Sequence, residues 1–214
     1  MAPVCGAPLS PHRPDTTEGC HKMKRMMRRL ALPAAALALA TVTACGNDSD
    51  SPTVSDSESH NTADLTFATD MIPHHAQAIE MADMALAQAG SEPVVDLAQQ
   101  IKAAQDPEIE QMTAWLETWG EPTPDDAMPG MDPGEMPGMM SAQDMEQMSA
   151  LHGAAFDRMW LQTMTEHHEG AITMAESEVE TGENADAQAL AQNIIDAQTA
   201  EIETMTGLLE KLNN

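Results

Sequence analysis

Residues 64–82, DLTFATDMIPHHAQAIEMA, recur as residues 157–175, DRMWLQTMTEHHEGAITMA. The repeat extends further, because residues 64–117 align without a gap to residues 157–210 and 21 of the 54 aligned positions are identical. Each copy therefore contains two segments, and the first of them places a pair of histidines among methionines.

Both segments of each copy are predicted to be helices. Residues 64–89 are rich in Ala, Met, Leu, Gln and Glu, which favour helix over strand. Gly90 and Gly182 end the first helix of each copy. Second helices are therefore expected at about residues 91–119 and 184–212.

The predicted fold class is all-α, a four-helix bundle built from two repeated hairpins, residues 64–119 and 142–214. Apolar residues of the second helices recur at helical spacing and form one stripe, so the two hairpins can bury one another. The connector, residues 120–141, contains five prolines and four glycines and is not expected to be helical. It is long enough for either a simple up-down-up-down bundle or a ferritin-like crossover.

The first part of the chain is typical of an exported lipoprotein. A basic segment, residues 22–29, precedes an apolar one, residues 30–42, and the following VTAC resembles a bacterial lipobox that ends at Cys45. We expect residues 1–44 to be a signal peptide with an upstream start that is not used. Residues 45–63 would be a lipidated cysteine and a flexible tether. The mature protein would then be anchored to the outer face of the cytoplasmic membrane.

Charge and cysteine content exclude several kinds of function. Beyond Cys45 there are three basic and 33 acidic residues, a net charge near −30, which excludes nucleic acid as a partner. Cys5 and Cys20 precede the expected cleavage site, so no free thiol remains for a disulfide or a metal.

The paired histidines and nearby methionines are predicted to bind metal. On a helical wheel they share one face in each copy, together with small alanines. Imidazole and thioether are the ligands that copper(I), and by the same chemistry silver(I), prefers. Hydrogen-bonded core histidines and packed methionines are the alternative, but the matched duplication favours metal. The expected ligands are Met71, His74, His75 and Met81, and Met164, His167, His168 and Met174.

Further polar and sulfur-containing side chains are candidates for additional ligands, or for groups that fix an imidazole tautomer. The alternative is a position at the edge of the surface or in a polar contact between helices. They are Asp64, Asp157, Gln105, Glu108, Gln198, Glu201, Met112 and Met205.

The connector carries methionines on a chain expected to be unstructured. Such thioethers could capture copper(I) or silver(I) weakly and at acidic pH, whereas imidazoles protonate near a pKa of about 6.5 and release metal. A plain linker is the alternative. The methionines are Met128, Met131, Met136, Met139 and Met140.

The repeated pattern resembles the bacterial domain of unknown function family 305. The resemblance covers nearly all of the expected folded region. The second copy departs from the pattern at two positions, where Trp160 replaces Phe67 and Glu166 replaces Pro73. It implies a ferritin-like four-helix bundle exported to the cell envelope, some of whose members bind copper and support copper tolerance.

Three functions are compatible with these features. The first is an envelope protein that captures, buffers or hands on copper(I) or silver(I), with a copper-delivery partner or a second copy as partner and no organic cofactor. The second is a ferritin-like oxidase with a dinuclear metal centre, which uses Glu-x-x-His motifs that the sequence beyond Cys45 lacks. The third is a structural envelope module without metal, which leaves the matched histidines unexplained.

Overall fold

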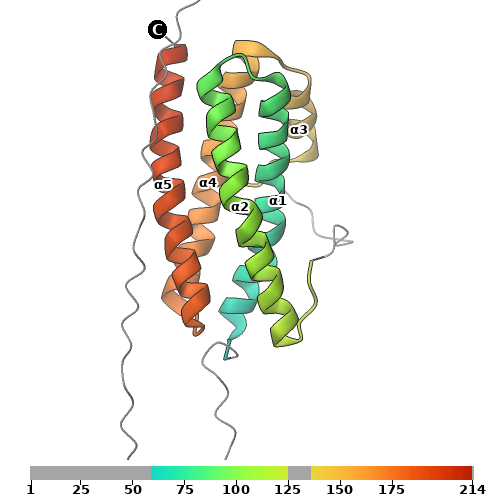
Figure 1. Cartoon of the computed structure of the whole chain (residues 1–214), viewed down its shortest axis with the longest axis vertical. Coiled ribbons are helices and arrows are strands. Elements are labelled where there is room, and N and C mark those ends of the chain that lie inside the picture. Colours follow the sequence, from blue (N-terminus) through green and yellow to red (C-terminus); the bar gives the residue numbers. More distant parts are fainter. Residues whose placement is uncertain (1–58, 125–135, 214) are drawn as a thin grey trace, which may run out of the picture. The chain divides into compact units, whose positions relative to one another are not determined.

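The computed structural model describes residues 59–124 and 136–213, and in these ranges it contains five helices and no β-strand. Four long helices pack side by side and a short one lies against them (Figure 1). The predicted all-α bundle of two hairpins is confirmed. The helices are α1 (Thr62–Gln88), α2 (Glu92–Trp119), α3 (Ala142–Ser149), α4 (Gly153–Thr181) and α5 (Ala185–Leu212).

Several sequence predictions lie outside the described residues. They are the signal peptide, lipidation at Cys45, and the two connector methionines Met128 and Met131. Within the described ranges, no helix has both the length and the apolar character needed to cross a membrane.

Side-chain caps set the helix bounds. The Asn61 side chain accepts hydrogen bonds from the backbone N–H groups of Ala63 and Asp64, and Asp64 accepts one from the Asn61 N–H at 2.6 Å. This reciprocal cap satisfies N–H groups that have no partner inside the helix. It explains why α1 begins two residues earlier than predicted. Asn184 caps α5 in the predicted place.

The short helix α3 was not predicted, since the sequence suggested only four helices. Ser141 begins it by accepting a hydrogen bond from the Asp144 N–H. Met145 and Met148 bury one face of α3 against the long helices. Eight residues are too few to show a clear helical period, so capping and tertiary packing decide this element.

The connection between the hairpins is a crossover along the length of the bundle. A backbone bridge joins Ala89 to Gly153, so α4 begins where α1 ends. At the opposite end, the Asn61 side chain donates to the Thr181 carbonyl, and His60 stacks on Trp119. Because α2 ends at that opposite end, the chain must run back along the bundle before α4 begins (Figure 1). Of the two connectivities left open by the sequence, the structure has the crossover.

The two hairpins hold one another by equivalent contacts. Asp64 accepts hydrogen bonds from the N–H groups of Glu183 and Asn184 in the α4–α5 loop. Asp157, its counterpart in the repeat, accepts one at 2.8 Å from Gly90 in the α1–α2 loop. Gly90 and Glu183 are themselves equivalent positions. The first helix of each hairpin therefore fixes the loop of the other hairpin.

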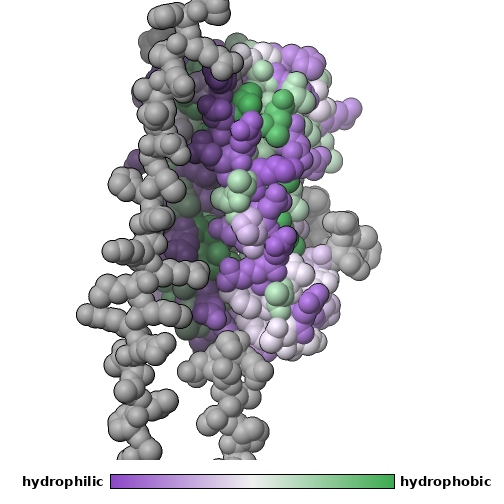
Figure 2. Space-filling view, viewed as in Figure 1, coloured by the Kyte–Doolittle hydropathy of each residue, from purple (hydrophilic) through white to green (hydrophobic). Residues whose placement is uncertain are grey.

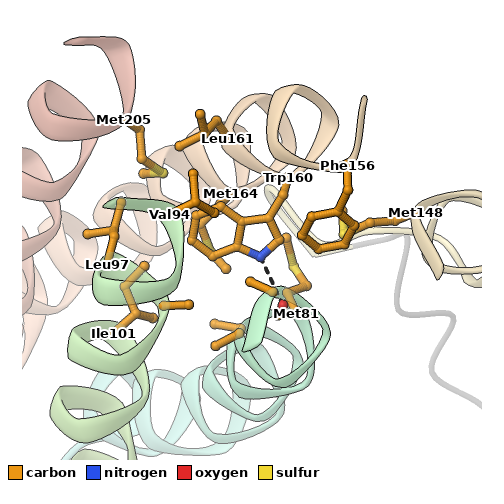
Figure 3. Close-up of a cluster of buried hydrophobic side chains, with 14 of the residues drawn as sticks. Met81, Val94, Leu97, Ile101, Met148, Phe156, Trp160, Leu161, Met164 and Met205 are labelled. Atoms are coloured by element: carbon orange, nitrogen blue, oxygen red, sulfur yellow. Dashed lines mark hydrogen bonds between the residues drawn. The ribbon is translucent and has the colours of Figure 1, made fainter. Parts of the chain in front are cut away.

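The hydrophobic core forms two clusters along the bundle. One contains Trp160, whose indole N–H donates to the Met81 carbonyl at 2.8 Å, and Phe156 packs nearby (Figure 3). The other contains Phe67 and Ile194. Burying a large apolar side chain contributes about 1.5–3 kcal/mol. The face shown in Figure 2 is mainly hydrophilic, as the acidic composition requires.

A buried carboxyl group, Glu178, lies beside Asp64. Burial and the Asp64 carboxylate raise the pKa of Glu178 to about 8. Burial also raises the pKa of Asp64, but hydrogen bonds, led by the Asn61 N–H, outweigh it and hold that pKa below its usual value. At neutral pH the proton therefore resides on Glu178 and the charge on Asp64.

We predict that Glu178→Gln stabilises the metal-free protein at high pH. The folded pKa is raised from 4.5 to about 8, so the stability that Glu178 contributes is full below pH 4.5 and is lost as the pH rises through 8. A neutral amide avoids this loss, and the gain should reach on the order of 1–3 kcal/mol at pH 9. Urea denaturation at pH 5, 7 and 9 measures it. Glu180→Gln, at an exposed position of α4, is the control. If the increase in the free energy of unfolding caused by Glu178→Gln does not grow with pH, the raised pKa of Glu178 is contradicted.

Candidate metal centre

Four histidines lie together in the interior of the bundle. His74 and His75 on α1, and His167 and His168 on α4, are each at most 1% exposed. The rings of His74 and His167 are 3.9 Å apart between centroids and tilted by 40°. Because α1 and α4 are antiparallel, the equivalent histidines of the two repeats meet. The predicted inward face is confirmed for all four residues.

Two carboxylates fix the tautomers of two of these rings. The Nε2 atom of His75 is 2.7 Å from Oε2 of Glu108, and Nε2 of His168 is 2.7 Å from Oε2 of Glu201. An ionised carboxylate only accepts hydrogen bonds, so each Nε2 carries the proton. The Nδ1 atoms then carry lone pairs, and both are buried without a partner among the described residues. This is how a carboxylate prepares a histidine to ligate a metal.

A backbone carbonyl does the same for a third ring. Nε2 of His74 donates to the carbonyl oxygen of Pro137 at 3.0 Å, so its Nδ1 lone pair is also buried and unpaired by any described residue. His167, the counterpart of His74, has neither the Pro137 contact nor a carboxylate partner within the described ranges. The equivalent histidines thus differ in their surroundings.

Burial keeps two of the rings neutral. It is the main cause that lowers the pKa of His74 to about 3, with the nearby His75 ring next. Burial and the ring of His74 also hold the pKa of His167 well below its usual 6.5. The sequence-based expectation that every imidazole protonates near pH 6.5 is therefore wrong for these two. Their lone pairs stay available in mild acid.

The predicted methionines lie in both core clusters. Met71 is fully buried in the cluster that contains Phe67, and Met81 and Met164 are fully buried in the cluster that contains Trp160. Met174 is only partly buried, at the border of the Phe67 cluster. Three of the four predicted thioethers are thus core residues.

The remaining candidates are distributed differently. Asp64 lies ten residues before His74 on α1, about 15 Å along the helix at 1.5 Å per residue, and binds the α4–α5 loop. Asp157 likewise binds the other loop. The structure does not bring these two aspartates to the histidines. Gln105 and Gln198 are buried, and their side-chain oxygens have no partner among the described residues.

Met112 and Met205 complete this set. Both are fully buried, Met112 in the Phe67 cluster and Met205 in the Trp160 cluster. The sulfur of Met205 accepts a hydrogen bond from the Thr165 hydroxyl at 3.8 Å.

Imidazole and carboxylate groups alone do not form a metal site in the described part of the chain. In residues 59–124 and 136–213, no group of three or more His, Cys, Asp or Glu side chains lies in a position to hold a metal ion. An ion with three protein ligands at the histidines would therefore need a further kind of donor, either thioether sulfur or an amide or backbone oxygen. A set that includes thioether sulfur suits a soft ion.

The end of the connector is not the free chain that the sequence suggested. Residues 136–141 pack on the bundle, where Met140 is only 6% exposed and belongs to the Trp160 cluster. Met136 and Met139 are partly buried. The prediction of an unstructured, exposed methionine is wrong for Met140. The Pro137 carbonyl was missed because no side-chain pattern marks a backbone acceptor.

The sequence profile of the Domain of unknown function (DUF305) matches residues 64–209, from the first repeated aspartate to the end of the second copy. The chain belongs to the DUF305 family. A crystal structure of a DUF305 protein from Streptomyces coelicolor is 34% identical, with a TM-score of 0.63 over 71% of this chain and 94% of that one. A DUF305 fragment from Deinococcus radiodurans is 30% identical, with a TM-score of 0.64 over 71% and 97%.

A third similar structure was solved with metal. CopM in a copper(I)-bound form is 31% identical, with a TM-score of 0.58 over 71% of this chain and 98% of CopM. CopM was also solved in copper(II)-bound and silver-bound forms. No curated protein sequence matches the chain.

We predict that His74 and His167 stay neutral in the metal-free DUF305 protein down to about pH 5. The pKa of His74 in the folded protein is about 3 and that of His167 lies well below 6.5, so the stability that they contribute is full above pH 6.5 and is lost as the pH falls through each folded pKa. NMR titration of the imidazole carbons should show a midpoint near 3 for His74 and no midpoint near 6.5 for either ring. A midpoint near 6.5 in the folded protein contradicts the burial argument.

Proposed function

We propose that this DUF305 protein binds copper(I) or silver(I) at the four buried histidines and captures, buffers or hands on copper in the cell envelope. The observation that carries the proposal is the set of buried Nδ1 lone pairs. Glu108 and Glu201 hold the His75 and His168 rings in the tautomer that leaves the lone pair on Nδ1.

Packing alone does not account for this arrangement. A buried polar atom without a partner costs about 1–3 kcal/mol. Most buried polar side-chain atoms in proteins have a hydrogen-bond partner, whereas His74, His75 and His168 each use only Nε2 within the described ranges. A bound cation could satisfy two of these nitrogens at once.

Sulfur ligands favour a soft ion over zinc, nickel or iron. Met71, Met81 and Met164 are buried on the two helices that carry the histidines. Thioether with imidazole selects copper(I) or silver(I). CopM, solved with copper(I), copper(II) and silver, supports the same choice.

The surroundings favour binding over catalysis. A dinuclear oxidase centre uses carboxylates as metal ligands, but Glu108 and Glu201 each face a histidine nitrogen at 2.7 Å. In that position they orient imidazoles. A protein that stores or carries metal needs oriented ligands. Unlike an enzyme, it does not need an acid or base next to an open coordination position.

The acidic surface suits a role in capturing cations. A net charge near −30 beyond Cys45 raises the local concentration of cations around the protein. Delivery from a copper-carrying partner protein, or transfer to one, is part of the proposal. Residues 1–44 would export the chain and Cys45 would anchor it.

Changing His74, His75, His167 and His168 together to Ala should abolish tight copper(I) binding. Competition with a copper(I) chelator near neutral pH should show at least a roughly 100-fold loss, because each histidine supplies a ligand. His152→Ala, at an exposed histidine before α4, is the matched control. Full affinity in a quadruple variant of unchanged helix content would refute the metal centre.

A second variant avoids removing any imidazole. Glu108→Ala with Glu201→Ala leaves all four rings but removes the groups that fix two tautomers, and it should weaken copper(I) binding about 10–100-fold. Equal affinity in this variant would show that the carboxylates do not orient the ligands.

Export and anchoring are tested separately. Mass spectrometry of the cell-derived protein should find a mature N-terminus at a lipid-modified Cys45, as the basic and apolar segments before it predict. A chain that still contains Lys22 contradicts this part of the proposal and leaves the metal centre unaffected.

A further inference from the structure

The end of the connector, residues 136–141, forms a strap across α1 and α4 beside the histidines. The Pro137 carbonyl accepts the hydrogen bond from His74 at 3.0 Å. Three residues later, the Met140 N–H donates to the Gln77 side chain at 2.7 Å, and the Gln77 amide donates back to the Met140 carbonyl at 2.9 Å. Two residues of α1 thus hold the strap by three hydrogen bonds.

Close backbone contact with α4 requires glycine on both sides. A Cβ atom added at Gly170 of α4 would overlap the Pro137 carbonyl group. A Cβ atom at Gly138 would lie 2.6 Å from the Glu166 carbonyl oxygen, and its φ of 75° also disfavours other residues. The strap and α4 cannot easily move apart to make room for a Cβ atom, because the contacting atoms on both sides belong to the backbone.

Both helix contacts come from the same position of the repeat. Gln77 and Gly170 are equivalent, 93 residues apart. On α1 this position clamps the strap, and on α4 it leaves room for it. A glycine inside a helix costs about 1 kcal/mol relative to alanine. Gly170 is therefore explained by the strap and not by the needs of the helix.

We propose that the strap is a positioning element of the metal centre and that Gly170 is the residue that admits it. The Pro137 carbonyl holds His74 with its proton on Nε2, as Glu108 and Glu201 do for His75 and His168. The Nδ1 atom of His74 is thereby kept as a lone-pair donor. The copper part of this inference rests on the proposed function.

The strap also makes the two halves of the centre unequal. Within the described residues, the Pro137 carbonyl of the strap accepts a hydrogen bond from His74 and none from His167. The strap therefore fixes the tautomer of one ring of the first repeat and of no ring of the second. The first repeat should supply the more rigid pair of ligands.

The test is Gly170→Ala, with Gly207→Ala as the matched control. Both glycines are inside helices, but a Cβ atom at Gly207 meets nothing within 4 Å. In the metal-free protein, hydrogen exchange of the Met140 amide reports docking of the strap, and ¹⁵N NMR of His74 reports its tautomer. We expect a protected amide and a single Nε2-protonated tautomer in the wild type and in Gly207→Ala. Gly170→Ala should exchange rapidly and show a tautomer mixture.

Copper(I) competition then measures the consequence. Gly170→Ala should bind about 10–100-fold more weakly than Gly207→Ala, the usual effect of losing a group that orients a ligand. Gln77→Ala, which removes the clamp without a clash, should change both NMR measurements and the affinity in the same direction.

Two results would overturn the inference. One is an unchanged Met140 exchange rate in Gly170→Ala and Gln77→Ala. The other is a released strap with an unchanged His74 tautomer or an unchanged copper(I) affinity. If the wild type itself binds no copper(I), the proposed function fails, and the metal-free measurements still decide whether the strap orients His74.

Discussion

Burial of four imidazole rings between α1 and α4 is the constraint that Glu108, Glu201 and the Pro137 carbonyl serve. A buried ring needs acceptors for its N–H groups. Glu108 and Glu201 reach in from the second helix of each hairpin, and the Pro137 carbonyl reaches in from the connector. Each acceptor forms a hydrogen bond with one ring nitrogen and leaves the lone pair of the other nitrogen buried and unpaired by any described residue. The contacts that reduce the cost of burying these rings therefore also leave nitrogens that could bind a ligand.

The duplication supplies this layer and the frame around it. Antiparallel packing of α1 and α4 brings equivalent histidines face to face, and Asp64 and Asp157 fix the loops at the two ends. The repeated aspartates seemed from the sequence to belong with the metal ligands. The structure shows why repetition alone cannot assign a role, because a contact that closes the bundle is duplicated as readily as a ligand.

The sequence predicted the features that depend on local pattern. Helical periodicity placed the histidines and most methionines inside. The repeat made Glu108 and Glu201 candidate partners of an imidazole, with a position at the edge of the surface left open as the alternative. The sequence could not predict α3, because a helix of eight residues depends on Ser141 and on tertiary packing of Met145 and Met148. It also missed the buried Glu178, since the equivalent Ala85 gives no signal and the pKa depends on Asp64. Met140 was placed on a free chain because its partner, Gln77, is far away in sequence.

The crossover connection has a consequence for how such a centre could arise. A homodimer of one hairpin would obey two-fold symmetry, so both histidine pairs would have identical surroundings. In a fused chain the connector exists only once and breaks that symmetry. The position that is glutamine on α1 could then become glycine on α4. Fusion thus allows one repeated histidine pair to diverge into two pairs with different surroundings, a difference that no symmetric dimer can encode.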